Sequence, residues 1–151
     1  MGAAYFYHLT DRPLDATLPV LLGKALQAGW RVEVRGKDAT MLERLDRVLW
    51  DGDGFLPHGL KGGPHDAVQP VLLTTEAGGN SATCVMSVDG ADVTAEEVSA
   101  LERVCILFND ADADAVDHAR QQWRSLTGAG VAAQYWAEDA GRWVKKAESG
   151  T

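Results

Sequence analysis

Two arginines flank a tryptophan at helical spacing in the last third of the chain. Arg120, Trp123 and Arg124 stand at positions i, i+3 and i+4, which share one face of a helix. Guanidinium groups bind carboxylates through forked, charge-assisted hydrogen bonds, and an indole ring offers an apolar surface. This set could therefore hold an acidic peptide that ends in an apolar residue. The alternative is a half-buried tryptophan beside two solvated arginines, some of which pair with nearby aspartates.

A second set of residues lies in the segment 49–60, which cannot be regular secondary structure. Its members are Trp50, Phe55, Leu56, Pro57 and His58. Two Asp-Gly dipeptides mark turns, and Pro57 disfavours a helical conformation at the preceding residue. Large apolar side chains on such a loop either pack beneath it or contact a partner, and both alternatives are open. The histidine is either a hydrogen-bonded anchor of the loop or a direct partner contact.

The patterns of the common cofactor and metal sites are missing. The first strand-to-helix connection, Thr10-Asp11-Arg12-Pro13, has no glycine that would let the backbone approach a pyrophosphate. The pair Gly23-Lys24 lacks the flanking residues of a phosphate loop, and the four histidines have no metal-ligand spacing. We therefore predict no cofactor, no metal site and no catalytic residue. A nucleotide-dependent enzyme is the alternative function that this pattern disfavours.

Strands and helices alternate along the chain in a way that would position both sets. Strands are expected at residues 4–9, 31–34, 71–74, 83–88, 104–108, 131–136 and 142–145. Helices are expected at residues 14–28, 40–50, 94–101 and 111–127, with Thr40 and Thr94 as N-caps. This alternation predicts one Rossmann-like α/β domain over residues 1–151, with a mixed, largely parallel sheet and helices on both faces. Strands 71–74 and 83–88 should form an antiparallel hairpin, and the tail after about residue 146 should be frayed.

The last long helix should place Trp123 at the border of its buried face. Ala115, Ala119 and Leu126 form the expected core stripe, which leaves the two arginines progressively more exposed. An acidic run precedes and opens this helix and should be solvated there, because carboxylates near a helix N-terminus are favourable. Its members are Asp110, Asp112, Asp114 and Asp117.

Charge and composition limit the classes of partner. The 151 residues carry a net charge of −8, which disfavours strong direct binding to nucleic acid, because such binding depends on Lys and Arg neutralising phosphates. The apolar runs are too short to cross a membrane, so no membrane partner is expected. Cys84 and Cys105 lie in apolar, strand-like runs and are expected to be buried thiols in a reducing cytoplasm. A disulfide or a nucleophilic Cys105 is the alternative.

The ordered set of motifs resembles the chi subunit of bacterial DNA polymerase III. The matching segments extend from about Tyr5 to Trp143. They are Phe6-Tyr7-His8-Leu9, Gly29-Trp30-Arg31-Val32, Phe55-Leu56-Pro57-His58-Gly59-Leu60, Gln69-Pro70-Val71-Leu72-Leu73-Thr74, Glu102-Arg103-Val104-Cys105 and Ala119-Arg120. The resemblance implies a non-catalytic subunit of the holoenzyme that links the clamp-loader machinery to single-stranded DNA-binding protein.

The resemblance also implies a partner for each set. Chi-family proteins bind the acidic, Phe-ending C-terminal tail of single-stranded DNA-binding protein through the pattern Ala-Arg-x-x-aromatic-basic. That pattern is met here by Ala119, Arg120, Trp123 and Arg124. The family uses the Trp and Phe around the first motif to hold the psi subunit or another replication or repair partner, such as a DNA helicase. Trp50 and Phe55 match those positions, although the spacer between them is shorter here than in the family.

Overall fold

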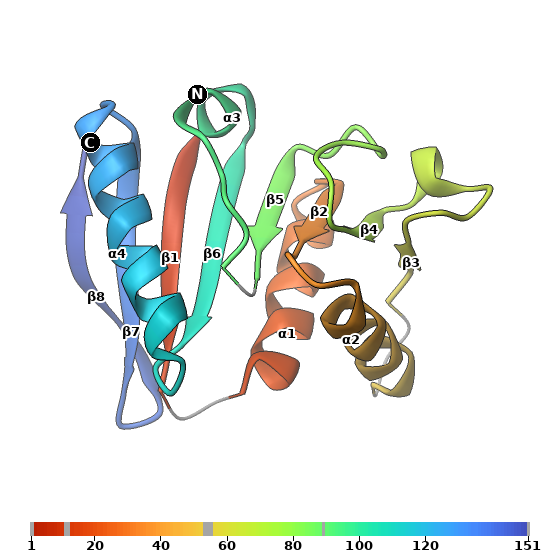
Figure 1. The fold of residues 1–151 in the computed structure, drawn as a ribbon, viewed down its shortest axis with the longest axis horizontal. Helices are drawn as coiled ribbons and strands as arrows, with labels where there is room; N and C mark the ends of the chain where they lie inside the picture. The colour runs from red at the N-terminus through yellow and green to blue at the C-terminus, as the bar shows by residue number, and fades with distance from the viewer. Residues whose placement is uncertain (1, 11–12, 53–55, 89, 151) are drawn as a thin grey trace.

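Eight strands form one sheet in the computed structural model, which describes residues 2–10, 13–52, 56–88 and 90–150 (Figure 1). The strands are β1 (Ala3–Leu9), β2 (Val32–Arg35), β3 (Gly59–Leu60), β4 (Val71–Thr74), β5 (Cys84–Ser87), β6 (Arg103–Asn109), β7 (Ala132–Asp139) and β8 (Arg142–Ser149). The helices are α1 (Leu14–Gln27), α2 (Ala39–Asp51), α3 (Ala95–Ala100) and α4 (Ala113–Gly128), with a 3-10 turn at Asp66–Val68. The predicted α/β fold is confirmed.

The order of the strands is β3-β4-β2-β5-β6-β1-β7-β8, and every neighbouring pair is parallel except β7 with β8. The prediction of a mixed, largely parallel Rossmann-like sheet is therefore confirmed. The expected hairpin between residues 71–74 and 83–88 is wrong, because β4 and β5 lie on opposite sides of β2 and each pairs with it in parallel. All four residues of each strand are buried, which is typical of interior parallel strands rather than of a half-exposed hairpin.

The connection between β4 and β5 is fixed by one buried amide. Asn80 donates hydrogen bonds from Nδ2 to the backbone oxygens of Val32, at 3.0 Å, and Gln69, at 2.9 Å. These bonds hold the connecting segment at the start of β2. The segment can therefore pass from β4, on one side of β2, to β5, on the other. The Gly-Gly-Asn sequence that suggests a tight turn is therefore part of a crossover between parallel strands.

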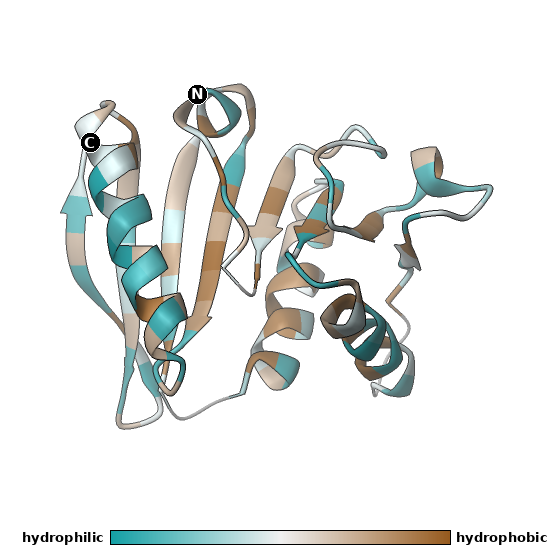
Figure 2. Ribbon diagram, viewed as in Figure 1, coloured by the Kyte–Doolittle hydropathy of each residue, from teal (hydrophilic) through white to brown (hydrophobic). Residues whose placement is uncertain are grey.

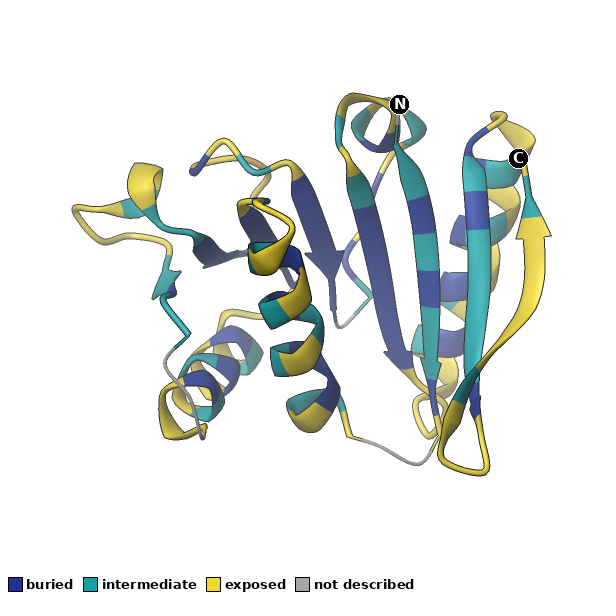
Figure 3. Cartoon of the chain, turned by 180° about the vertical axis from the view of Figure 1, so that it is seen from behind, coloured by how far each residue is buried: buried dark blue, intermediate teal, exposed yellow. Residues whose placement is uncertain are grey.

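Helices cover both faces of the sheet, and two apolar cores result. α1 and α2 pack over one face, where Val34, Leu73 and Met86 are buried, and α3 and α4 pack over the other, where Phe6 and Ile106 are buried. The two views in Figures 1 and 3 show α4 and α1 on opposite sides of the sheet. Figure 2 shows that β6 is largely hydrophobic while the outer surface of α4 is mostly hydrophilic. The prediction that residues 104–108 are buried on both faces is confirmed.

Two helix starts show how local sequence sets the boundaries. Thr94 and Glu97 form a complete capping box at the start of α3, as the sequence predicts. α2 begins one residue earlier than expected, because Asp38 rather than Thr40 is the N-cap. The Asp38 carboxylate accepts a hydrogen bond from the Thr40 backbone nitrogen at 2.9 Å.

The end of the chain is paired rather than frayed. β8 continues to Ser149 and runs antiparallel to β7, which corrects the expected loss of order after about residue 146. Ala140 and Gly141 both have positive φ, at 54° and 78°, which is the geometry of a two-residue hairpin turn whose twist matches that of the strands. The pairing places Ala147 opposite Tyr135, and both residues line a pocket with side chains of α4.

Candidate partner-binding sites

The acidic residues of α4 lie at its N-terminal end, where the helix dipole favours negative charge. Asp112 caps the helix, its Oδ1 accepting a hydrogen bond from the Ala115 backbone nitrogen at 3.2 Å, and Asp114 lies in the first turn. The two arginines follow further along the helix, away from its positive N-terminal end. The prediction that the acidic run is exposed and opens a helix is confirmed for these residues.

The buried face of α4 holds the helix in one orientation. Its buried residues are Val116, Ala119, Gln122 and Leu126, so the expected stripe is confirmed at Ala119 and Leu126, while Ala115 is only partly buried. The buried amide of Gln122 accepts a bond from the Val93 nitrogen at 3.0 Å and donates one to the Val93 oxygen at 3.2 Å. Because both polar ends of this side chain are bonded, α4 is fixed against the loop that precedes α3.

Trp123 lies at the border of this face, as predicted, inside a cluster of three rings. Its ring lies edge-on to that of Phe6, with centroids 5.3 Å apart, and edge-on to that of Tyr135 at 5.8 Å. Phe6 and Tyr135 are stacked at 6.2 Å. Aromatic pairs in such geometries are worth about 0.5–1.5 kcal/mol beyond the area that they bury. The indole is therefore held in place and half-buried.

The two arginines beside the indole are weakly engaged within the chain. The side chain of Arg120 is 65% exposed, and its Nη1 lies 4.0 Å from Asp117 Oδ1. An exposed pair at that distance contributes less than about 1 kcal/mol. Arg124 is exposed, and no carboxylate of the described residues lies within ion-pair distance of it. Both guanidinium groups can therefore donate hydrogen bonds to an external carboxylate, since only a weak ion pair within the chain has to be broken first.

The structure brings the three predicted residues together around one small pocket. Arg120, Trp123, Arg124, Tyr135 and Ala147 line a cavity of about 250 Å³. This volume is below the usual range for drug-sized ligands, roughly 300–1,000 Å³, and suits a single side chain. The pocket thus has an aromatic wall and two cationic groups at its rim.

Two lining residues, Tyr135 and Ala147, were not predicted. The alternation of residues 131–136 gives the signal for Tyr135, because it places that ring on the same face as Ala133. Ala147 has no such signal, since its position depends on the pairing of β8. Burial raises the pKa of Tyr135, the charge of Arg120 opposes this, and that of Asp110 adds to it.

The second predicted set is separated into exposed and buried members. Contrary to expectation, the segment 49–60 is not irregular throughout, because it begins in the last turn of α2 and ends in β3. Trp50, in that turn, is 60% exposed and contacts His58, with ring centroids 4.5 Å apart. The side chain of His58 is fully buried. Its Nδ1 lies 2.7 Å from the Leu56 oxygen, and its Nε2 lies 3.0 Å from Asp46 Oδ1. Of the two alternatives for this histidine, the structure has the loop anchor, so the ring supports the surface around Trp50 from beneath.

Two further members of the second set, Leu56 and Pro57, lie at or near the core. Leu56 is partly buried and packs against the core under α1 and α2, and Pro57 is also partly buried. Phe55 lies outside the described residues. Among the members of this set that the structure describes, Trp50 is the one with a large apolar side chain exposed to solvent. The strand order puts β3, beside this set, and β8, beside the α4 pocket, at opposite edges of the sheet, so the two sets lie apart in the fold (Figure 1).

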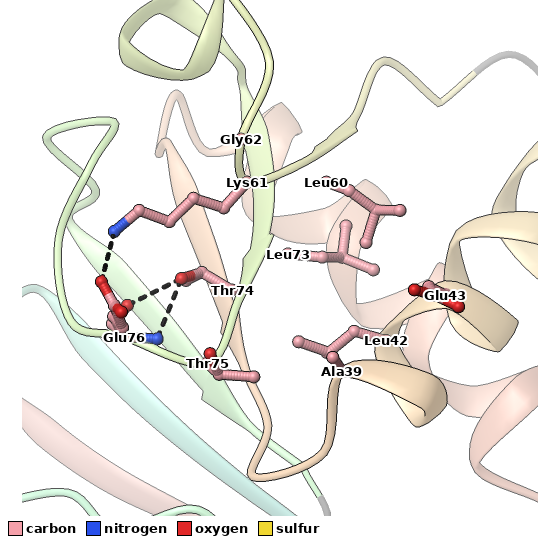
Figure 4. A pocket seen from close by; sticks show the side chains of 10 residues that line it. All are labelled: Ala39, Leu42, Glu43, Leu60, Lys61, Gly62, Leu73, Thr74, Thr75 and Glu76. Atoms are coloured by element: carbon pink, nitrogen blue, oxygen red, sulfur yellow. Dashed lines mark hydrogen bonds and ion pairs between the residues drawn. The ribbon is translucent and has the colours of Figure 1, made fainter.

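A cavity of about 330 Å³ lies where open α/β sheets commonly bind ligands, at the carboxyl ends of β3 and β4 (Figure 4). Its apolar lining residues include Leu42, Leu60 and Leu73. Two carboxylates, those of Glu43 and Glu76, also line it. The one lysine of the lining, Lys61, is paired with Glu76 at 3.2 Å. An excess of carboxylates opposes a phosphate group, so the lining does not suit a nucleotide.

The glycine-rich loop beside this cavity has its backbone donors in use. The nitrogens of Gly62 and Gly63 donate to the two carboxylate oxygens of Asp66, at 2.9 and 3.1 Å. A carboxylate of the chain itself therefore takes the bonds that a phosphate would need. At the end of β1, the Thr10 nitrogen likewise donates to Glu138 Oε1 at 3.1 Å. The described residues contain no group of three or more side chains placed to hold a metal ion.

The two cysteines are free and buried in the described structure. Their side chains belong to the core under α1 and α2. A hydrogen bond with Cys84 raises the pKa of the Cys105 thiol, and burial raises it further. A raised pKa disfavours the thiolate, so Cys105 lacks the activation that a nucleophile requires. Within the described residues, no helix is long and apolar enough to cross a membrane.

Comparison with known proteins identifies one family. The family model described as DNA polymerase III chi subunit, HolC, matches residues 1–134. A search of curated proteins found no match. The matched range includes the segment 49–60 and all of α4, but it stops before Tyr135 and β8. Two of the five residues that line the α4 pocket are therefore outside the part that the family model covers.

Proposed function

The chain belongs to the family of DNA polymerase III chi subunits, accessory subunits of the polymerase, and from this we propose that it links the replication machinery to single-stranded DNA-binding protein. The link would be made by holding the acidic C-terminal tail of that protein. A second surface would connect the chain to the clamp loader through a psi-like subunit or, instead, to a DNA helicase. The expected site of action is the cytoplasm.

The observation that carries the tail proposal is the pocket beside α4. Its aromatic wall, Trp123 and Tyr135, can pack against a terminal phenylalanine, and Arg120 and Arg124 can bind the α-carboxylate and nearby acidic side chains. Weak pairing of these arginines within the chain supports the proposal, because little has to be broken before a tail binds. The aromatic cluster supports it also, since a fixed wall lowers the entropic cost of binding.

The expected affinity is modest. One aromatic anchor and one or two desolvated arginines can each contribute about 2 kcal/mol as hot spots. After the cost of association, this corresponds to a dissociation constant on the order of micromolar.

The experiment that tests the adaptor role compares two forms of single-stranded DNA-binding protein on the same oligonucleotide. In a gel-shift series at physiological salt, this protein should add a further shift with the intact form and none with the tail-deleted form. By itself it should bind single-stranded DNA poorly, because its net charge of −8 opposes a phosphate backbone. A shift with this protein alone, or equal shifts with both forms, would contradict the adaptor mechanism.

We propose that the second surface centres on Trp50, with Phe55 beside it in sequence. The 60% exposure of the Trp50 side chain, at the end of a helix and above a buried histidine, supports a partner contact at this position. Capture from lysate of the source organism, with wild type and with Phe55→Ala, separates the candidate partners. A psi-like subunit or a helicase should be captured by wild type and lost from the variant. Equal capture by both would remove Phe55 from the site.

The proposal includes the absence of catalytic activity in this chain. The bonds of Gly62 and Gly63 to Asp66, and the carboxylates around the cavity at the carboxyl ends of β3 and β4, support it against a nucleotide-dependent enzyme. Equilibrium binding of ATP and NAD tests this alternative, and no saturable binding is expected at millimolar ligand. Saturable binding of either nucleotide would favour the enzyme.

A further inference from the structure

A chain of hydrogen bonds reaches the α4 pocket from three separate strands or their ends. His8 on β1 lies between Asp110, which follows β6, and Tyr135 on β7. His8 Nε2 is 2.7 Å from Asp110 Oδ1, and His8 Nδ1 is 2.9 Å from the Tyr135 hydroxyl oxygen. Tyr135 in turn lines the pocket with Arg120 and the indole of Trp123. Asp110 and Tyr135 are each more than 100 residues from His8 in sequence.

The chemistry of the partners decides where the hydrogens lie. The Asp110 carboxylate can only accept, so His8 Nε2 carries a hydrogen and donates it. In the neutral ring the other nitrogen is then an acceptor, and the Tyr135 hydroxyl donates to it. The hydroxyl oxygen keeps its lone pairs and can accept from a donor at the pocket. Arg120 lines the same pocket as the Tyr135 ring.

The surrounding side chains hold the three hydrogen-bonded residues, Asp110, His8 and Tyr135, in one arrangement. The His8 side chain is 17% exposed and packs on Phe108, with ring centroids 4.7 Å apart. The ring of Tyr135 contacts Phe6, Phe108 and Trp123. Asp110 is 61% exposed, so the end of the hydrogen-bonded series that is farthest from the pocket is in contact with solvent.

From this geometry we infer that Asp110, His8 and Tyr135 form a positioning chain for the tail pocket, and this rests on the tail-binding function proposed above. Asp110 fixes the tautomer of His8, and His8 orients the Tyr135 hydroxyl. The oriented hydroxyl holds the Tyr135 ring in place as one wall of the pocket that Arg120 also lines. His8 and Asp110 act through Tyr135 and do not touch the tail.

The test is a titration of a fluorescent tail peptide, acidic and ending in phenylalanine, against full-length variants. Tyr135→Phe keeps the ring and removes the hydroxyl, and His8→Leu removes both polar atoms of the imidazole. Each should weaken binding about fivefold to tenfold, the effect of one well-placed hydrogen bond. His8→Asn, which keeps a polar atom near the position of Nδ1, should restore most of the affinity. Thermal unfolding of each variant is measured alongside, to confirm that the domain is folded.

The double variant His8→Leu/Tyr135→Phe separates positioning from a general structural effect. If His8 acts through the hydroxyl, the double variant binds no more weakly than either single variant. Independent losses that multiply in the double variant would overturn the inference, as would unchanged affinity in both single variants. Absence of binding by wild type would instead overturn the proposed function itself.

The direction in which Asp110→Ala changes tail affinity separates a positioning role from a purely electrostatic one. Removing a negative charge near a site for an acidic tail should by electrostatics alone strengthen binding. The positioning chain predicts the opposite, a loss of about fivefold. Asp114→Ala is the matched control, because it removes the same charge from an exposed position of the first turn of α4 and should leave binding equal or slightly tighter. Tighter binding by Asp110→Ala would overturn the inference.

Discussion

Trp123 and Trp50 both lie in the second half of a helix, yet the molecule supports them in different ways. Trp123 contacts two other aromatic rings and is half-buried beside the core. Trp50 is 60% exposed and lies on the ring of His58, which is itself buried and bonded to the loop that follows. One tryptophan is a wall of a pocket, and the other is a protruding surface.

The difference separates two ways of presenting an aromatic side chain to a partner. A side chain that also fills space in the core has a fixed position, but its loss affects folding and binding together. A protruding side chain contributes little to folding, so its loss can affect a partner alone. We therefore expect stability and binding to change together at α4 and separately at the end of α2.

The largest combined effect is expected for Trp123→Ala. Removing a half-buried tryptophan from an aromatic cluster should lower the free energy of unfolding by about 2 kcal/mol, less than the 3–5 kcal/mol of a fully buried ring. Tail-peptide affinity should fall about 30-fold, as expected for a hot-spot residue. Urea unfolding and peptide titration measure the two quantities, and Trp123→Phe, which keeps a ring, should recover part of both. Loss of stability with full tail affinity would place Trp123 in the core only.

A smaller effect, confined to stability, is expected for His58→Ala. The variant leaves the Leu56 oxygen and the Asp46 side chain without their partner and removes the support under Trp50. The free energy of unfolding should fall by about 1–3 kcal/mol, the cost of unmade buried hydrogen bonds. Tail affinity should stay within twofold of wild type, since the two sites are at opposite edges of the sheet. A large change in tail affinity would show that the two regions are coupled.

The smallest effect on folding is expected for Trp50→Ala. The free energy of unfolding should change by less than about 1 kcal/mol, because most of the side chain is already exposed. Capture of the second partner should nevertheless be lost, while tail affinity is unchanged. Val20→Ala is the matched control, because Val20 is another large apolar residue, 57% exposed, on a different helix. A decrease of several kcal/mol in the free energy of unfolding of the Trp50 variant would contradict the distinction between the two tryptophans.

Most of the fold could be predicted from hydrophobic periodicity and capping residues. The alternation of elements and the capping box at Thr94 depend on nearby residues, so the sequence contains them directly. The pairing of β4 and β5 with β2 could not be predicted in the same way, because Asn80 joins segments far apart in sequence. The strand expected at residues 142–145 is present, but its continuation to Ser149 could not be predicted, because a polar, charged edge strand resembles a disordered tail.

The candidate sites show the same division. Helical spacing alone puts Arg120, Trp123 and Arg124 on one face, and the structure places them around one pocket. The contributions of Tyr135 and Ala147 depend on strand pairing, which the sequence does not specify. Burial decides the role of His58, and a loop sequence gives no direct measure of burial.

The most direct test of the tail-binding claim is the affinity of the tail peptide for wild type, Arg120→Ala and Arg124→Ala. Arg142→Ala is the matched control, because it removes the same charge at the far end of the β7–β8 hairpin from Ala147. Wild type and the control should bind with equal affinity, weakening as salt is raised, because exposed ion pairs are screened. Arg120→Ala and Arg124→Ala should each lose about tenfold or more. Unchanged affinity in both of these variants would contradict the assignment of the tail to this pocket.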